Sequence, residues 1–244
     1  MKNWFYIVIL LVACSKEKRN DCLTSLGDVT TVERQLETFT KVYAEDRIKL
    51  VLIQDSSLDG RIAITAPGNL IPQIKSDVSE GQLRLENTNT CNFVRSFDYS
   101  IVVKVYFKNL IQLDLESIAS ASTEDTLHLS DFAIYHSALS DIELLLNCSN
   151  HILIKTINSA HTTLKGRAKA IRGSIEEISD LDARSLVCEE VLIDSHTPLN
   201  CYVNGTKGLF IKIYNSGNVY YVDEPSTYKD LNEKLGEGDL LKLN

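Results

Sequence analysis

The chain has 244 residues, of which 44% are hydrophobic, and a formal net charge of −8 at pH 7. That length suits one large all-β domain or two small domains, and the apolar content is sufficient to bury a core. The acidic charge counts against nucleic acid as a partner and against electrostatic docking on anionic membranes, since both depend on Lys and Arg.

The amino terminus has the build of a signal peptide over residues 1–13. Lys2 supplies a positive charge, and the ten residues from Trp4 to Ala13 are all hydrophobic. Ten residues of helix rise only about 15 Å, which is half the hydrocarbon thickness of a bilayer, so this run is too short to span a membrane. The pattern predicts export followed by cleavage.

Cys14 directly follows this run. The residues Leu11-Val12-Ala13-Cys14 resemble a bacterial lipobox, in which the Cys carries a lipid anchor and becomes the first residue after cleavage. The alternative is an ordinary signal peptide with a Cys nearby by chance. A polar segment follows, so we predict a lipid-anchored tether over residues 14–33 and one body over residues 34–244. The predicted location is the bacterial cell envelope, at the outer membrane, with its periplasmic or surface side left open.

The first half of the body alternates apolar and polar residues, which is typical of half-buried strands. The predicted strands cover residues 47–53, 61–65, 82–86 and 99–107. Residues 68–74 contain Pro72 and predict a short helical turn. We expect this amino-terminal part to be rich in antiparallel strands.

A repeat appears after about residue 110. Small or polar turn residues recur at positions 117, 137, 159, 174, 195, 216 and 237, with steps of 20, 22, 15, 21, 21 and 21 residues. Short apolar pieces fill each interval, which favours a β-solenoid whose stacked coils share one core. A β-sandwich is the competing interpretation, because two strands with their turns give the same spacing. Asn147, Asn158, Asn200 and Asn215 are predicted to stack as ladders inside the turns.

Several late segments carry a more specific pattern of turns: 173–175, 181–183, 215–221, Pro225 and 236–240. Together with residues 39–42, 47–53, 69–70, 81–85 and 91–96, they resemble the auto-transporter adhesin head GIN domain family of Bacteroidetes envelope lipoproteins. The resemblance runs from about Arg34 to the carboxyl end. It implies a right-handed parallel β-helix-like solenoid and adhesion, although a fold alone does not settle function.

The chain departs from the family at its turn glycines. Ile118, Ala138, Ala160 and His196 stand at positions where the family's turns have Gly. Glycine adopts positive φ at little cost, whereas a β-branched residue such as Ile resists it. Some turns are therefore expected to follow a different backbone path.

Five cysteines remain if Cys14 is lipidated. Cys22 and Cys91 lie in predicted loops and are candidates for a disulfide in an oxidising compartment. Cys148, Cys188 and Cys201 are expected to be buried free thiols, since the first two lie two coils apart, about 10 Å, too far for a bridge. The spacing of Cys and His predicts no zinc site or other metal site, and no cofactor is expected.

Two groups of side chains contain residue types found in catalytic sites. His136 and His196 near Asp194 and Ser195 contain the residue types of a hydrolytic triad, but Ser and Asp are also ordinary turn residues. A carbohydrate lyase would need acids and bases converging in a cleft. The basic cluster and its acidic neighbours also suit a solvated face with charge pairs; they are Lys165, Arg167, Lys169, Arg172, Glu176, Glu177, Asp180 and Asp182. No residue is predicted to be catalytic.

Tyrosines near the carboxyl end form the predicted binding face: Tyr202, Tyr214, Tyr220 and Tyr221. Tyr is also a favoured strand residue, so a purely structural role is the alternative. The sequence therefore predicts a non-catalytic envelope lipoprotein, attached to a membrane through Cys14, whose solenoid binds a protein or glycan and no nucleic acid. A carbohydrate-active enzyme on the same scaffold and an architectural spacer remain as alternatives.

Overall fold

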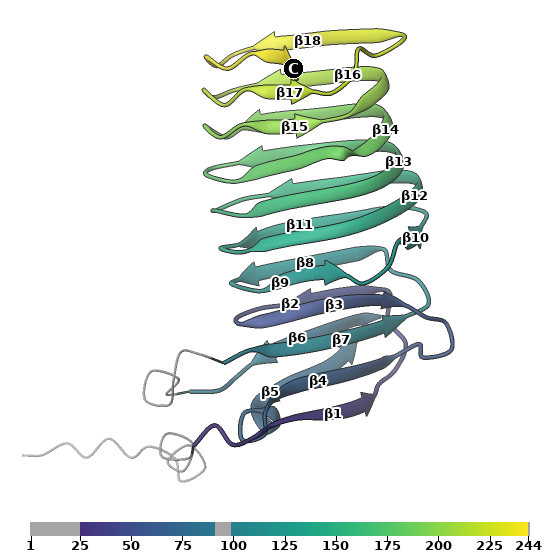
Figure 1. Ribbon diagram of the computed structural model, residues 1–244, viewed down its shortest axis with the longest axis vertical. Helices are drawn as coiled ribbons and strands as arrows, with labels where there is room; N and C mark the ends of the chain where they lie inside the picture. The colour runs from purple at the N-terminus through teal and green to yellow at the C-terminus, as the bar shows by residue number, and fades with distance from the viewer. Residues whose placement is uncertain (1–24, 91–98, 244) are drawn as a thin grey trace, which may run out of the picture.

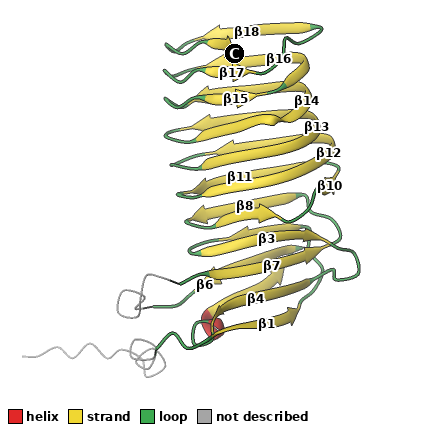
Figure 2. Ribbon diagram, viewed as in Figure 1, coloured by secondary structure: helices red, strands yellow, loops and turns green. Residues whose placement is uncertain are grey.

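The computed structural model describes residues 25–90 and 99–243, most of which lie in strands that stack into one elongated body (Figures 1 and 2). The described part contains a single 3₁₀ helix, η2 (Ile71–Gln73), with Pro72 in its first turn, as the sequence predicts. No helix within the described ranges is long and apolar enough to cross a bilayer. The predicted signal peptide, Cys14, Cys22 and Cys91 lie outside the described residues.

The repeating unit is a coil of about 20 residues, since Asp141 pairs with His161 on the next coil. Each coil is built on one long, bent strand. The clearest examples are β12 (Asp141–Thr156), β13 (His161–Glu176) and β14 (Asp180–His196). The first half of β12 pairs with β9 and β10, whereas its second half pairs with β11. Each coil therefore contributes to two faces before a short turn returns the chain to the first (Figure 1).

The two faces run along the body, and we call them the first and the second face. In order from the amino-terminal end, the first face contains β1 (Val29–Gln35), β4 (Arg61–Pro67), β7 (Ile101–Phe107), β3 (Ile48–Gln54), β9 (Ser120–Thr123) with β10 (Leu127–Leu129), the first halves of β12, β13 and β14, β15 (Cys201–Val203), β17 (Val219–Tyr221) and β19 (Leu240–Lys242). The second face contains β5 (Ile74–Ser79), β6 (Gln82–Asn87), β2 (Lys41–Ala44), β8 (Gln112–Ser117), β11 (Phe132–Ala138), the second halves of β12, β13 and β14, β16 (Gly205–Ile213) and β18 (Tyr228–Lys234).

The amino-terminal end of both faces is antiparallel, as the sequence predicts. On the first face β4 is antiparallel to β1 and to β7, and on the second face β5 is antiparallel to β6. β1 begins at Val29, inside the segment predicted as a tether, and its residues are nearly all exposed. It therefore lacks the buried alternation that marks the other strands in the sequence.

The rest of the body is a parallel stack, which confirms the predicted β-solenoid. β13 pairs in parallel with β12 over its whole length and with β14 on its other side. A sandwich of two antiparallel sheets is excluded, because each long strand passes from one face to the other and the neighbouring strands come from successive coils.

Positive φ at non-glycine residues marks three of the turns. Ser117 (62°), Asn158 (70°) and Glu177 (57°) adopt this conformation. The residue that takes positive φ thus lies beside Ile118 and near Ala160, so neither Ile118 nor Ala160 has to adopt it.

The turn positions predicted at Ser137, Ser174 and Ser195 are wrong. Ser137 lies in β11, Ser174 in β13 and Ser195 in β14. The misassigned Gly173-Ser174 pair produced the irregular step of 15 residues, whereas the turn of that coil lies at residues 177–179. Ser and Gly are typical of turns, but here they occupy a strand.

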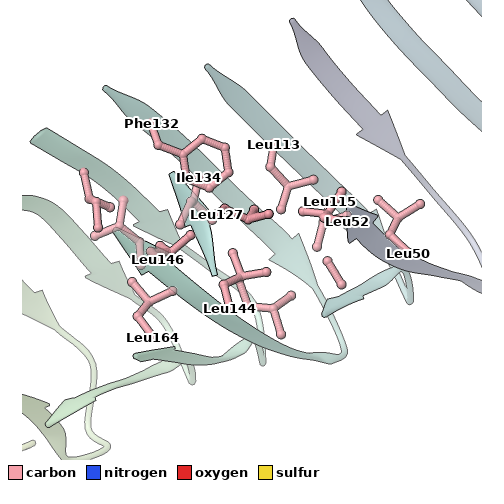
Figure 3. Close-up of a cluster of buried hydrophobic side chains, with 14 of the residues drawn as sticks. Leu50, Leu52, Leu113, Leu115, Leu127, Phe132, Ile134, Leu144, Leu146 and Leu164 are labelled. Atoms are coloured by element: carbon pink, nitrogen blue, oxygen red, sulfur yellow. The ribbon is translucent and has the colours of Figure 1, made fainter. Parts of the chain in front are cut away.

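The core fills the space between the two faces with inward-pointing aliphatic side chains. Figure 3 shows Leu50, Leu52 and Leu144 of the first face opposite Leu113 and Ile134 of the second. Because successive coils stay in register, each inward position continues as a column, such as Leu83, Val42, Leu113, Ile134 and Ile154 on the second face. The core is continuous along the stack, so no coil buries its apolar residues alone.

Buried polar side chains line the turn edge of this core. His136 is fully buried, with Nδ1 2.9 Å from Thr162 Oγ1 and Nε2 3.2 Å from Ser140 Oγ. Thr156 and Ser179 pair through their hydroxyls at 3.0 Å. His136, Thr156 and Ser179 thus each have a partner within the protein, which offsets the cost of their burial.

The predicted asparagine ladders are only partly correct. Asn200 Oδ1 accepts the backbone N–H of Asn218 at 3.1 Å, and Asn218 Oδ1 accepts that of Asp239 at 2.8 Å, so one turn edge is laddered over three coils. Asn158 and Asn215 instead donate to carbonyls of the preceding coil, and Asn147 is exposed on the first face. Asn158, Asn200 and Asn215 thus bond to backbone, Asn147 contacts His128, and none of the four amides bonds another.

Candidate functional site

A shallow groove of about 570 Å³ crosses the outer side of the second face from β11 to β16. Its side chains belong to two outward columns, because alternate residues of a strand point to opposite sides of the sheet. Leu153 pairs with Arg172, Arg172 with Leu192 and Leu192 with Phe210 along the first column. An arginine thus lies between apolar side chains on three neighbouring strands.

The second column of the groove is polar beyond its first member. It runs in register through Tyr135, Lys155, Ser174, Asp194 and Lys212. Tyr135 is 37% exposed and Leu153 of the other column is 40% exposed, so the groove is an open surface and not an enclosed pocket.

The floor of the groove is set by Gly173. Its φ is 153°, and a Cβ at this position would lie 1.7 Å from the carbonyl oxygen of Ile154. Only glycine allows the two backbones to come this close. With the small side chain of Ser174 beside it, the sheet surface is low between the larger side chains of β12 and β14.

A second apolar surface follows the turns. Leu139, Ile178 and Leu235 are 62%, 60% and 63% exposed, and Ile118 and Leu199 are also exposed. We call these five residues the turn ridge. Apolar side chains repeated at one edge of the coils are unusual for a solvated turn, and such surfaces often mark interaction sites.

The four tyrosines of the predicted binding face do not lie together. Tyr202 and Tyr220 stack on the first face with ring centroids 5.3 Å apart, and the Arg184 guanidinium lies 3.8 Å from the Tyr202 centroid. Tyr214 stacks on His196 with ring centroids 4.0 Å apart, at the carboxyl ends of β14 and β16 on the second face. Tyr221 is buried in the core, where its hydroxyl donates to Glu224 at 3.0 Å.

The residues weighed as a hydrolytic triad are also separated. His136 and Ser195 point into the core, three strands apart along one column, whereas Asp194 and His196 point outward. Adjacent strand residues face opposite sides, so Asp194, Ser195 and His196 cannot converge on one substrate. This arrangement does not support hydrolysis there.

The charged cluster of β13 forms pairs on both faces. Lys165 bonds Glu143 on the first face, and Lys155 lies 3.3 Å from Glu176 on the second. These are exposed pairs between neighbouring coils, as a solvated face would have. The acids and bases of a lyase are not gathered in one cleft.

The three described cysteines are buried and free, as the sequence predicts. Burial raises the pKa of Cys148, Cys188 and Cys201 to about 12. Cys148 and Cys188 lie two strands apart, because each pairs with Ala168. Since the thiolate is the reactive form, these groups are inert while the protein is folded.

The exposed histidines pair one by one. His151 lies 3.2 Å from Asp131, and His161 bonds Asp180. His128 contacts the side-chain amide of Asn147. Over the described ranges, no three His, Cys, Asp or Glu side chains are grouped so as to hold a metal ion.

The groove is not predicted from the sequence, where Arg172 belongs to a basic cluster interpreted either as part of a lyase site or as a solvated charged face. The signal was present, since Leu153, Leu192 and Phe210 each lie one residue before a buried strand position. Their common outward side becomes visible only when the turns are placed at residues 157–160, 177–179 and 197–200.

Comparison with solved structures finds the same fold. A crystal structure described as a putative adhesin from Bacteroides fragilis NCTC 9343 has a TM-score of 0.79 at 17% identity and covers 88% of this chain and 97% of that one. A putative adhesin from Parabacteroides distasonis ATCC 8503 has a TM-score of 0.62 at 15% identity, covering 89% and 98%. From the same organism, a structure described as a putative lipid binding protein has a TM-score of 0.54 at 15% identity, also covering 89% and 98%.

No curated protein matches the chain. The family model described as "Putative auto-transporter adhesin, head GIN domain" matches residues 38–225. That range holds most of both faces, the groove and four members of the turn ridge. On this match, the chain belongs to the auto-transporter adhesin head GIN domain family.

Proposed function

We propose that this protein is a non-catalytic lipoprotein of the bacterial cell envelope, anchored through Cys14, whose solenoid binds a protein or glycan in adhesion. Membership of the adhesin head family supports a binding role. The scattering of the candidate catalytic side chains supports a role without chemistry.

The groove of the second face is the observation on which the proposal rests. Strands hold its side chains in fixed register, so the surface is preorganised and little conformational entropy is lost when a partner binds. Leu153, Leu192 and Phe210 place apolar area at the surface, where water contact is unfavourable. The turn ridge gives a second surface of this kind.

The anchor is tested by replacing Cys14 with Ser in the full-length chain. This variant should no longer incorporate a labelled fatty acid and should no longer sediment with the membrane fraction, because its residue 14 has no thiol to acylate. Continued labelling of the Cys14→Ser protein would contradict the proposed anchor.

The binding role is tested with cells that display the full-length chain, applied to an array of glycans and matrix proteins. We expect retention on one class of spots. The double variant Leu153→Asp/Leu192→Asp should abolish retention, because it puts two charges into the apolar column of the groove.

The matched control uses the same two strands on the other face. Leu145 in β12 and Val187 in β14 are each 37% exposed, and Leu145→Asp/Val187→Asp should leave retention unchanged. Loss of retention only in Leu139→Asp/Ile178→Asp would move the binding site to the turn ridge. Absence of retention on every spot would contradict the binding role.

A further inference from the structure

The cations of the groove stand out on an acidic protein. The chain has a net charge of −8, yet Lys155, Arg172 and Lys212 line the groove against one acid, Asp194. Lys155 also forms an ion pair with Glu176, with 3.3 Å between Nζ and Oε1. The local balance of charge is thus opposite to that of the whole chain, which makes the groove complementary to an anionic partner.

Arg172 differs from Arg84 and Arg184, each of which lies against an aromatic ring and forms an ion pair. Arg84 bonds Glu86 and lies 4.2 Å from the Tyr43 centroid, and Arg184 lies 2.8 Å from Asp182 and stacks on Tyr202. Arg172 is exposed, and among the described residues it has no ion pair. Its register neighbours are Leu153 and Leu192. Apolar flanks lower the local dielectric, so a charge-assisted hydrogen bond to this guanidinium is stronger than one in open water.

The groove is long in relation to one small ligand. Tyr135 and Phe210 lie at its two ends, four strand spacings apart, which is about 19 Å at the usual spacing. Lys155 in β12 and Arg172 in β13 lie between these two rings, whereas Lys212 lies on the same strand as Phe210. Open surface, aromatic ends and separated cations fit an extended polymer better than an acyl chain, which needs an enclosed apolar tunnel.

We propose that the groove of the second face binds a linear glycan that carries carboxylate groups, with Arg172 as the principal carboxylate ligand. This inference rests on the proposed binding function and names its partner. The planar guanidinium donates two parallel hydrogen bonds to the two oxygens of a carboxylate. The C–H faces of sugar rings pack on Tyr135 and on the apolar column, since both surfaces exclude water.

The test measures binding of the full-length chain, purified in mild detergent and immobilised, by biolayer interferometry. The probes are polygalacturonate, alginate and hyaluronate, with neutral dextran as the uncharged polymer. At least one carboxylated polymer should bind, and dextran should not. Arg172→Gln should weaken that binding at least tenfold, as expected for loss of a charge-assisted pair.

The control is Arg167→Gln, which removes an exposed arginine from the same strand, β13, but on the first face. Its affinity should stay within twofold of the wild type. An equal loss in Arg167→Gln would show attraction by overall charge and would overturn the groove as the site. Unchanged binding in Arg172→Gln would do the same.

Two further outcomes would overturn the choice of partner. In the first, the protein reconstituted in nanodiscs binds oleate or phosphatidylglycerol vesicles but no polysaccharide, and Arg172→Gln loses this lipid binding. The other is no binding to any of the three polyanions. If displaying cells are still retained on protein or neutral-glycan spots, and Leu153→Asp/Leu192→Asp abolishes this, the proposed function stands and only the acidic-glycan inference fails.

Discussion

His136 shows what a single residue does inside the stack. Its imidazole is buried between Thr162 and Ser140, and burial, with a smaller contribution from the positive charge of His161, lowers its pKa to about 4. An unfolded chain binds a proton at this residue near pH 6.5, whereas the folded protein does not until about pH 4. The folded state is therefore favoured fully above pH 6.5 and loses stability as the pH falls towards 4.

Replacing His136 with Gln should reduce this acid sensitivity. The free energy of unfolding should fall less between pH 7 and pH 4.5 in His136→Gln than in the wild type, by about 2–3 kcal/mol. Urea unfolding at several pH values measures it. Thr162→Val, which removes a hydrogen-bond partner and keeps the imidazole, should retain the wild-type pH dependence. If the free energy of unfolding depended on pH equally in His136→Gln and in the wild type, protonation of His136 would not be a cause of the acid sensitivity.

β13 is the element that shapes the coil beneath the groove. Its inward positions include Gly166, Ala168 and Ala170, whereas β12 and β14 carry Leu146 and Leu186 beside Gly166. Gly166 has φ of 110°, and a Cβ there would lie 2.0 Å from the carbonyl oxygen of Leu146. The backbone conformation at this point of β13 directs a Cβ towards β12, so only glycine fits there.

Gly166→Ala should lower the free energy of unfolding by about 2 kcal/mol or more, because the methyl group meets backbone and the positive φ adds strain. Urea denaturation of the full-length protein measures the change. Gly68→Ala is the control, since its φ is not positive and its nearest atom, the carbonyl oxygen of Asp28, is 3.4 Å away. A loss below 0.5 kcal/mol in Gly166→Ala would mean that the coils shift apart to accommodate the methyl group.

The strands at this scale were largely predictable, and their boundaries were less so. Alternation identified β3, β4, β6 and β7, and the repeat identified the coils, because these patterns record which side chains face the core. The turns near Ser174 and Ser195 were misplaced, since small residues serve both turns and crowded strands. The groove escaped prediction because it depends on outward residues from five successive strands of the second face, and their alignment is a property of the register.

The whole molecule is a one-dimensional stack, so its stability depends on contacts between neighbouring coils. The reactivity of its buried thiols measures how readily individual coils open. Cys201 lies in β15, near the carboxyl-terminal end, and Cys148 lies in β12, in the middle of the stack. Both pKa values are raised by burial to about 12, so neither reacts while its coil is closed.

Pulsed alkylation in mild urea should label Cys201 faster than Cys148, because terminal coils open without the middle ones. Peptide mass spectrometry resolves the two sites. Cys188, in β14, should be labelled at an intermediate rate. Equal rates at all three sites would show that the stack opens as one cooperative unit.

The order of strands on the second face also fixes the height of the groove. From β5 the face continues through β6, β2, β8, β11 and β12 to β13, which is six strand spacings and about 29 Å. The Debye length at physiological ionic strength is only about 8 Å. If Cys14 anchors the amino-terminal end and the stack stands upright on the membrane, Arg172 lies well outside the electrostatic reach of an anionic bilayer surface, and that membrane does not compete for its guanidinium.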